Sequence, residues 1–295
     1  MYCFLKKRTF IIKYPMKRDG QSISIWQHGM PEYNIIYDEL PTVVDVVIVG
    51  GGITGVSTAL NLQRMGKKCV IVEAQQIGFG TTGGTTAHLN TLMDTPYYRI
   101  KNNFGDDHAQ KVCNIVRSAI DRIEANTIDY EIECGFGRKT AYLFSQDEKQ
   151  SDELQKIVDS TNEVGIKMEY CTSIPVNIPF EKAAKLGEHG QIHPTQYLYG
   201  IAGAFEQEGG RIVQNCRTLE VITEGDETFV ITSKAKIKTK FVVYATHIPP
   251  GVNILHFRCA PYRSYVLGIK LKEENYPDAL VYDMMDPYHY YRTQK

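Results

Sequence analysis

The sequence has no excess of charge of either sign. Its 33 lysines and arginines nearly balance its 34 aspartates and glutamates, and the formal net charge is −1. A chain of this kind creates no strong field that would attract nucleic acid, an anionic membrane or an acidic substrate. We therefore expect no nucleic-acid partner.

Closely spaced cysteines are also lacking. The seven cysteines are scattered along the chain, and none forms a C-x-x-C pair. This spacing excludes a disulfide framework and a cysteine-rich zinc site. His189 and His193 are four residues apart, but Gly190 and Pro194 do not allow a helix there, so we predict no metal site.

A long apolar run is lacking as well. The stretch 43–62 is interrupted by Asp45 and by glycines 50–52, whereas a membrane span needs about 20 predominantly apolar residues. Residues 1–15 lack the apolar core of a secretion signal and are interpreted as a surplus extension ahead of Met16. We predict no membrane span and, because a reducing compartment suits the scattered cysteines, a cytoplasmic location.

The segment 43–73 has the pattern of a βαβ unit. Residues 43–49 form a β-branched run closed by glycines, 53–65 carry apolar residues at helical spacing, and 69–72 form a second apolar strand. Such units give parallel sheets with both faces covered. The pattern predicts an α/β fold.

Later segments predict further elements. Helices are expected from Asp106 or Asp107, as the N-cap, to residue 123, and at 152–164 and 195–208. Short strands at 211–213, 219–222, 229–232 and 237–244 predict a β-meander. Further strands are expected at 139–144, 263–270, 279–282 and 289–292, and in the last of these alternate residues should face opposite sides.

The glycines between the first strand and the first helix form a G-x-G-x-x-G motif. Gly50 would make the tight turn, Gly52 would let the backbone approach a pyrophosphate, and Gly55 would let helix and strand pack closely. The unpaired N–H groups near Ile53 and Thr54 would face the phosphates. The motif therefore predicts a dinucleotide site.

An acid and a polar loop follow at the positions such a site requires. Glu73 ends the second strand 23 residues after Gly50, close to the spacing of about 20 for an acid that binds a ribose hydroxyl. NAD and FAD both present this ribose, so the acid does not distinguish them. The segment 78–86 (GFGTTGGTT), called here the threonine loop, offers hydroxyl and N–H groups to a long polar ligand and favours FAD.

The segment from VVDVVIVGGGITG to GTTGGTTAHLNT resembles the FAD-dependent oxidoreductases of the D-amino-acid oxidase, glycine oxidase and sarcosine oxidase superfamily. It is similar above all to the branch in which such a domain precedes a Rieske iron–sulfur domain. Residues 191–194 (QIHP), 209–212 (GGRI) and 242–247 (VVYATH) extend the resemblance, which spans roughly 20–295. The resemblance implies a Rossmann-like FAD-binding domain with a β-meander, interleaved with a substrate domain that has a mixed sheet.

The resemblance also implies domain ranges and residue roles. The ranges are 1–40 for an N-terminal extension and lead-in, 41–100 and 185–250 for the FAD-binding domain, and 101–184 and 251–295 for a substrate domain incomplete at its C-terminal end. The cofactor-binding residues would be Gly50, Gly52, Ile53, Thr54 and Gly55 at the pyrophosphate, Glu73 at the ribose, Thr81, Thr82 and Thr85 towards the flavin ring, and Thr218 and Thr246 at the adenine pocket. The substrate side would include His88, Tyr262 and Arg263.

The expected reaction is hydride transfer from a small amine or amino acid to FAD, which is then reoxidised by oxygen or by an iron–sulfur carrier. The flavin accepts the hydride, so no side-chain nucleophile is required. No cysteine lies in C-x-H spacing, so a Rieske cluster would belong to a C-terminal domain that follows residue 295, and we expect the chain to be truncated there. An NAD-dependent dehydrogenase and an inactive nucleotide-binding fragment remain the alternatives.

Overall fold

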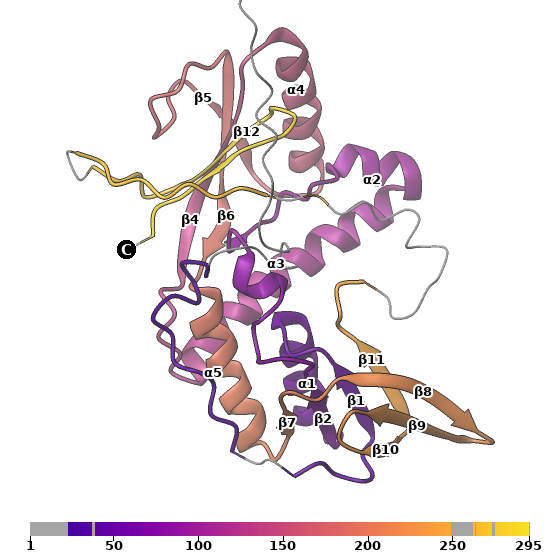
Figure 1. Cartoon of the computed structure of the whole chain (residues 1–295). Coiled ribbons are helices and arrows are strands. Elements are labelled where there is room, and N and C mark those ends of the chain that lie inside the picture. Colours follow the sequence, from indigo (N-terminus) through magenta and orange to yellow (C-terminus); the bar gives the residue numbers. More distant parts are fainter. Residues whose placement is uncertain (1–22, 37–38, 249–261, 263, 273–274, 295) are drawn as a thin grey trace, which may run out of the picture.

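The computed structural model describes residues 23–36, 39–248, 262, 264–272 and 275–294, which form three sheets and five α-helices (Figure 1). A parallel sheet has the order β11-β1-β2-β7, with β1 at Val46–Val49, β2 at Cys69–Val72, β7 at Arg211–Val213 and β11 at Phe241–Tyr244. An antiparallel meander consists of β8 at Thr218–Glu224, β9 at Glu227–Thr232 and β10 at Lys236–Thr239. The α/β fold class is confirmed.

The third sheet is mixed and lies in the upper part of Figure 1, away from the parallel sheet. Its order is β13-β12-β4-β6-β3, and β5 also pairs with β6. The strands are β3 at His88–Leu89, β4 at Gly137–Ser145, β5 at Met168–Cys171, β6 at Lys182–Gln191, β12 at Leu280–Asp283 and β13 at Tyr290–Tyr291. Apolar side chains of α2 (Tyr97–Phe104), α3 (Asp106–Asp129) and α4 (Glu148–Glu163) share a core with this sheet.

The parallel sheet is covered on both faces. Val46 and Ile48 of β1 face a core that includes α1 (Ile53–Arg64) and α5 (Pro194–Gln207). Val47 and Val49 face the other way, into a core shared with the meander strands β9 and β10. This burial on both sides explains the uninterrupted apolar run of β1 and β2.

Two predicted strands are not found as expected. The segment 237–244 splits at Lys240, because β10 pairs with β9 in the meander whereas β11 pairs with β1 in the parallel sheet. Residues 264–270 form no strand, and their large apolar side chains are exposed, with Tyr265 at 93% and Leu267 at 86%. Alternating apolar residues favour a strand only where a partner strand is available.

Several boundaries also differ from the predictions, since α3 continues to Asp129 and α4 begins at Glu148. The N-cap of α3 is Gly105. Asp106 and Asp107 lie within the first turn, where their negative charges interact favourably with the positive end of the helix dipole. The expected domain boundary at residue 185 falls inside β6, which pairs with β4 from Gln191 to Lys182. The domain assignment itself stays a prediction.

The lead-in segment 23–36 packs against the body of the molecule. Trp26 is 4% exposed and belongs to the core beside α1 and α5. The Tyr33 hydroxyl donates to the buried carboxylate of Glu206 at 2.6 Å, and burial beside that acid raises the pKa of Tyr33. Within the residues described, none of the helices has the length and apolarity to cross a bilayer.

Candidate functional site

The turn between β1 and α1 admits only glycine at two positions. Gly50 has a φ of +114°, and a Cβ there would lie 2.5 Å from the Ala245 carbonyl oxygen. A Cβ at Gly55 would lie 2.0 Å from the Gly50 carbonyl oxygen. Both distances are far below van der Waals contact, so the turn and the first helical residues pack backbone against backbone.

The N-terminus of α1 is open to an anion. Its N-cap is Gly52, which has no side chain to accept a backbone hydrogen bond, and no acid lies in the first turn. The N–H of Ile53 donates to Thr82 Oγ1 at 3.0 Å, and Thr54 is exposed. The N–H of Ile53, which we expected to be free, is thus paired with the loop, and the other N–H groups of the first turn create positive potential together with the helix dipole.

Glu73 lies directly beside the glycine turn. One carboxylate oxygen accepts from the N–H of Gly51 at 2.7 Å, and the other accepts from the N–H of Gln75 at 2.8 Å. These bonds fix the acid at the carboxyl end of β2, next to α1. The position is the one predicted from its spacing in the sequence.

The threonine loop folds back over the start of α1. Its centre is a single 3₁₀ turn, Thr81–Gly84, within the predicted irregular segment. Gly83 is packed closely, since a Cβ there would lie 2.3 Å from Gln27 Nε2. Thr82 reaches α1, as noted, and Thr85 Oγ1 accepts from the N–H of Ala87 at 3.1 Å.

Two side chains from distant segments hold the end of this loop. Trp26 Nε1 donates to the Thr85 carbonyl at 2.6 Å, and Arg292 Nη1 donates to the carbonyls of Thr86 and Ala87 at 2.9 Å each. The guanidinium also lies 4.9 Å from the centre of the Trp26 ring. Burial lowers the pKa of Arg292 to about 10, so it stays cationic near neutral pH. We call this pair the Trp26–Arg292 clamp; sequence reasoning missed it, because no local pattern connects its members.

The predicted adenine-side residues lie at two strand ends. Thr218 begins β8, and its Oγ1 is buried without a hydrogen-bond partner among the described residues. The preceding Cys216 donates its N–H to the Glu73 carbonyl at 2.8 Å, which places this strand beside the acid. Thr246 follows β11, and its hydroxyl donates to the Ile248 carbonyl at 2.7 Å. The chain two residues before Thr218 therefore lies beside Glu73.

Of the three predicted substrate residues the structure describes two, His88 and Tyr262, and their surroundings differ. His88 lies on β3, and its Nδ1 is 3.0 Å from the Tyr282 hydroxyl. Tyr262 is 92% exposed and belongs to no packed site, which corrects the expectation that it opens a strand. Arg263 lies outside the described residues. Tyr282, from β12, is the residue beside His88 that sequence reasoning missed.

The aromatic cluster 288–292 alternates as predicted. The Tyr290 ring packs against His88 and Tyr282 at 5.4 and 5.2 Å between ring centres, and Arg292, which directly follows β13, reaches the threonine loop. His289 and Tyr291 instead contact the buried carboxylate of Asp283. Only one face of this strand therefore adjoins the candidate site.

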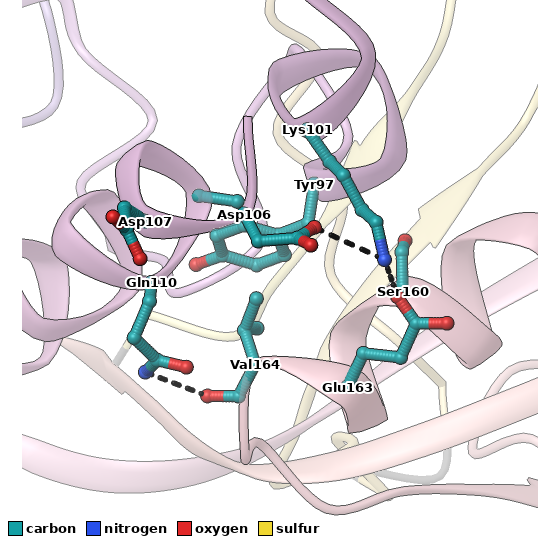
Figure 2. A pocket seen from close by; sticks show the side chains of 9 residues that line it. Tyr97, Lys101, Asp106, Asp107, Gln110, Ser160, Glu163 and Val164 are labelled. Atoms are coloured by element: carbon teal, nitrogen blue, oxygen red, sulfur yellow. Dashed lines mark hydrogen bonds and ion pairs between the residues drawn. The ribbon is translucent and has the colours of Figure 1, made fainter. Parts of the chain in front are cut away.

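The pocket in Figure 2 lies elsewhere, between α2, α3 and α4, and has a volume of about 410 Å³. Lys101 bridges its rim through Asp106 at 3.1 Å and Glu163 at 3.0 Å. None of the predicted site residues lines it. Within the described part of the chain, no three His, Cys, Asp or Glu side chains gather as a metal site would require, and the five cysteines found there are free thiols.

Comparison with known proteins gives one family and several relatives. Residues 45–295 match the family model DAO, described as FAD dependent oxidoreductase. A Bacillus subtilis (strain 168) protein named as a Rieske 2Fe-2S iron-sulfur protein, YhfW, is 31% identical over 261 residues, which cover 88% of this chain and 50% of the relative. Gamma-glutamylputrescine oxidoreductase of Escherichia coli is 27% identical over 210 residues, which cover 68% of this chain and 48% of the relative. The chain thus spans about half the length of the curated relatives it matches.

Solved structures share the fold. L-amino acid deaminase from Proteus myxofaciens superimposes with a TM-score of 0.63 at 21% identity, over 78% of this chain and 51% of that one. Glycine oxidase from Geobacillus kaustophilus gives a TM-score of 0.60 at 16% identity, over 70% of this chain and 55% of that one. At these identities the likeness concerns the arrangement of helices and strands.

Proposed function

Because the chain belongs to the DAO family of FAD dependent oxidoreductases, we propose that it binds FAD across the glycine turn and takes part in oxidising a small amine or amino acid. FAD, when bound, accepts a hydride from the substrate carbon. The remaining contributions belong to the protein, which holds the cofactor and orients the substrate.

The residues fit this cofactor. Gly50 and Gly55 allow the turn to pack backbone against backbone, and Gly52 leaves the N-terminus of α1, where a pyrophosphate would bind, without a side chain. Glu73 would bind the adenosine ribose, and Thr218, whose buried hydroxyl has no partner among the described residues, would lie at the adenine. The threonine loop would extend along the pyrophosphate towards the flavin ring. Ile53, Thr54, Thr81, Thr82, Thr85 and Thr246 complete the proposed set.

The observation that carries the proposal is the contact of Glu73 with Gly51 at 2.7 Å. The acid for which we propose the ribose role is thus in direct contact with a turn that admits only glycine at two positions. The spacing of acid and turn in the sequence and their contact in space agree.

The class of substrate and the electron acceptor are supported by the relatives. Gamma-glutamylputrescine oxidoreductase and the structurally similar amino acid deaminase and glycine oxidase are named for amines or amino acids. The Rieske protein from Bacillus subtilis supports an iron–sulfur carrier as acceptor, with oxygen as the other route. A cytoplasmic location accords with the free thiols of the described cysteines.

The experiment is to purify the full-length protein and record its visible absorption. We expect a flavin spectrum that is bleached anaerobically by amino acids or amines but not by the corresponding acids without nitrogen. A colourless protein that binds NAD tightly would instead favour the dehydrogenase alternative. Reoxidation by oxygen, compared with that by an iron–sulfur protein, then identifies the acceptor.

The Glu73→Gln variant tests the acid separately. Loss of the charge-assisted hydrogen bond to a ribose hydroxyl should weaken FAD binding about tenfold, since such bonds contribute roughly 1.5–3 kcal/mol. Glu220→Gln, on the exposed part of β8, is the matched control and should leave FAD affinity unchanged. Equal affinity in both variants would place the ribose elsewhere.

A further inference from the structure

Three side chains form a hydrogen-bonded row where the mixed sheet meets the threonine loop. The Tyr282 hydroxyl donates to Asn90 Oδ1 at 2.6 Å. The hydroxyl oxygen of Tyr282 also lies 3.0 Å from His88 Nδ1. Tyr282 belongs to β12, His88 belongs to β3, and Asn90 directly follows β3. Tyr282 is 8% exposed, and His88 and Asn90 are half-buried.

The row determines which nitrogen of His88 carries the proton. A tyrosine hydroxyl has one proton, and here it goes to Asn90. His88 Nδ1 must therefore donate to the Tyr282 oxygen, which leaves Nε2 as an acceptor with a free lone pair. Nε2 is buried and has no hydrogen-bond partner within the described residues.

The neighbouring His189 has the opposite arrangement. Its Nε2 accepts from the N–H of Leu92 at 3.3 Å, so its proton is on Nδ1, which is buried and likewise unpartnered among the residues described. Both imidazoles pack against the Tyr282 ring, at 5.2 Å for His88 and 6.1 Å for His189. His88 therefore offers an acceptor at this place, whereas His189 offers a donor.

His88 is also neutral. Burial lowers its pKa to about 3, and the Arg292 charge and His189 act in the same direction. The other titratable groups packed on it are Tyr282 and Tyr290, and burial raises the pKa of both. Near neutral pH the imidazole can thus accept a hydrogen bond without taking up a proton.

The position of His88 relates it to the proposed cofactor. It follows Thr86 and Ala87, whose carbonyls are bound by Arg292, and the same loop contacts the start of α1 through Thr82. If the loop runs from the pyrophosphate towards the flavin ring, as the proposed function holds, His88 lies at the ring end. The inference below rests on that function.

We propose that His88 Nε2 accepts a hydrogen bond from the N–H of the substrate amine. Tyr282 and Asn90 are positioning residues that keep the proton on Nδ1. The reacting form would be the neutral amine: the C–H bond next to nitrogen would break with its electron pair passing as hydride to FAD, when FAD is bound, and the nitrogen lone pair would form the C=N bond of an iminium ion that keeps its N–H. His88 holds the N–H throughout and takes no proton, so substrates that lack an N–H are selected against.

The test compares amine ligands with ether analogues in the full-length, FAD-loaded protein. The probes are sarcosine and proline, with methoxyacetate and tetrahydrofuran-2-carboxylate as analogues in which oxygen replaces N–H. Binding is followed by the change in flavin absorbance. We expect the wild-type protein to prefer each amine at least about tenfold, the discrimination typical of one lost hydrogen bond in a buried site.

His88→Leu should abolish this preference, and His88→Gln, whose amide oxygen can accept, should restore part of it. Tyr282→Phe leaves the imidazole of His88 in place but no longer fixes the proton on Nδ1. This variant should reduce the preference for amines without changing FAD affinity. The exposed His28→Leu is the control and should behave as wild type. Should His88→Leu fail to fold, the His88→Gln and Tyr282→Phe variants still decide the matter through the amine preference.

Two results overturn the inference. One is a His88→Leu protein that binds FAD and keeps the wild-type preference for amines. The other is a wild-type protein that binds FAD yet does not distinguish amines from ethers, and this result leaves the FAD site intact. A wild-type protein without FAD would refute the proposed function itself and, with it, this inference.

Discussion

The hydroxyl oxygen of Thr82 accepts the N–H of Ile53 at 3.0 Å, although the two residues are 29 positions apart. Gly52, at the N-cap, cannot provide such an acceptor, so the threonine loop caps the helix whose N-terminus would bind the pyrophosphate. The cap is therefore part of the same surface as the proposed phosphate site.

Thr82→Val removes this cap with little change in shape. We expect the free energy of unfolding to fall by about 1 kcal/mol, the usual effect of losing an N-cap, together with weaker FAD binding. Chemical denaturation and FAD titration measure the two effects. Thr223→Val, at an exposed position of β8 outside the proposed cofactor site, should change neither, and a similar loss in both variants would contradict the role given to Thr82.

Gly55→Ala should abolish FAD binding and lower the free energy of unfolding by about 3 kcal/mol, because the added Cβ would lie 2.0 Å from the Gly50 carbonyl. FAD content after purification and thermal unfolding are the measurements. Gly84→Ala provides the control, since a Cβ there meets nothing within 4 Å. Normal FAD content in the Gly55 variant would show that the turn adjusts.

Arg292→Met should loosen the end of the threonine loop. The carbonyls of Thr86 and Ala87 would lose their donor, and we expect a loss of about 2–4 kcal/mol in stability as well as poor FAD retention. Arg138→Met breaks the ion pairs of Arg138 with Asp121 and Glu124 at the surface and should cost at most about 1 kcal/mol. Proteolysis within the loop should increase only in the Arg292 variant; unchanged cleavage there would argue against the clamp.

Acid should destabilise the protein through its buried histidines. Burial lowers the pKa of His88 and His189 to about 3, whereas an unfolded histidine titrates near 6.5. As the pH falls below 6.5, the unfolded chain takes up protons that the folded chain does not. The free energy of unfolding should therefore fall by up to about 1.4 kcal/mol per pH unit for each histidine, until about pH 3.

Denaturation at several pH values between 7.5 and 5 measures this slope. The His189→Gln variant removes one of the two groups and should have a shallower dependence over that range. The exposed His28→Gln should keep the wild-type slope. A dependence that is the same in all three proteins would assign the acid sensitivity to carboxylates instead.

The βαβ unit could be predicted because its signals are local. The glycine turn, the helical spacing and the apolar strand all lie within 43–73, and the structure confirms each element. The position of Glu73 beside the glycine turn could also be predicted, because the carboxyl ends of neighbouring parallel strands lie at the same edge of a sheet. Residues that belong to the same βαβ unit can be predicted to be in contact from their spacing in the sequence alone.

Features that depend on distant partners could not be predicted. The chain around Lys240 is equally extended on both sides, and only the strands it meets assign β10 to the meander and β11 to the parallel sheet. His88 could be selected as a candidate, but Tyr282 is 194 positions away. The Trp26–Arg292 clamp joins opposite ends of the described chain, so no pattern near either residue indicates the other.

The clamp has a consequence for biosynthesis. Arg292 contacts Thr86 across 206 positions, so the threonine loop leaves the ribosome long before the guanidinium that holds it. The βαβ unit can fold early from neighbouring segments, since domains form from the N-terminal side during synthesis. Firm capture of the proposed cofactor is consequently a late event, which waits for one of the last described strands to be made.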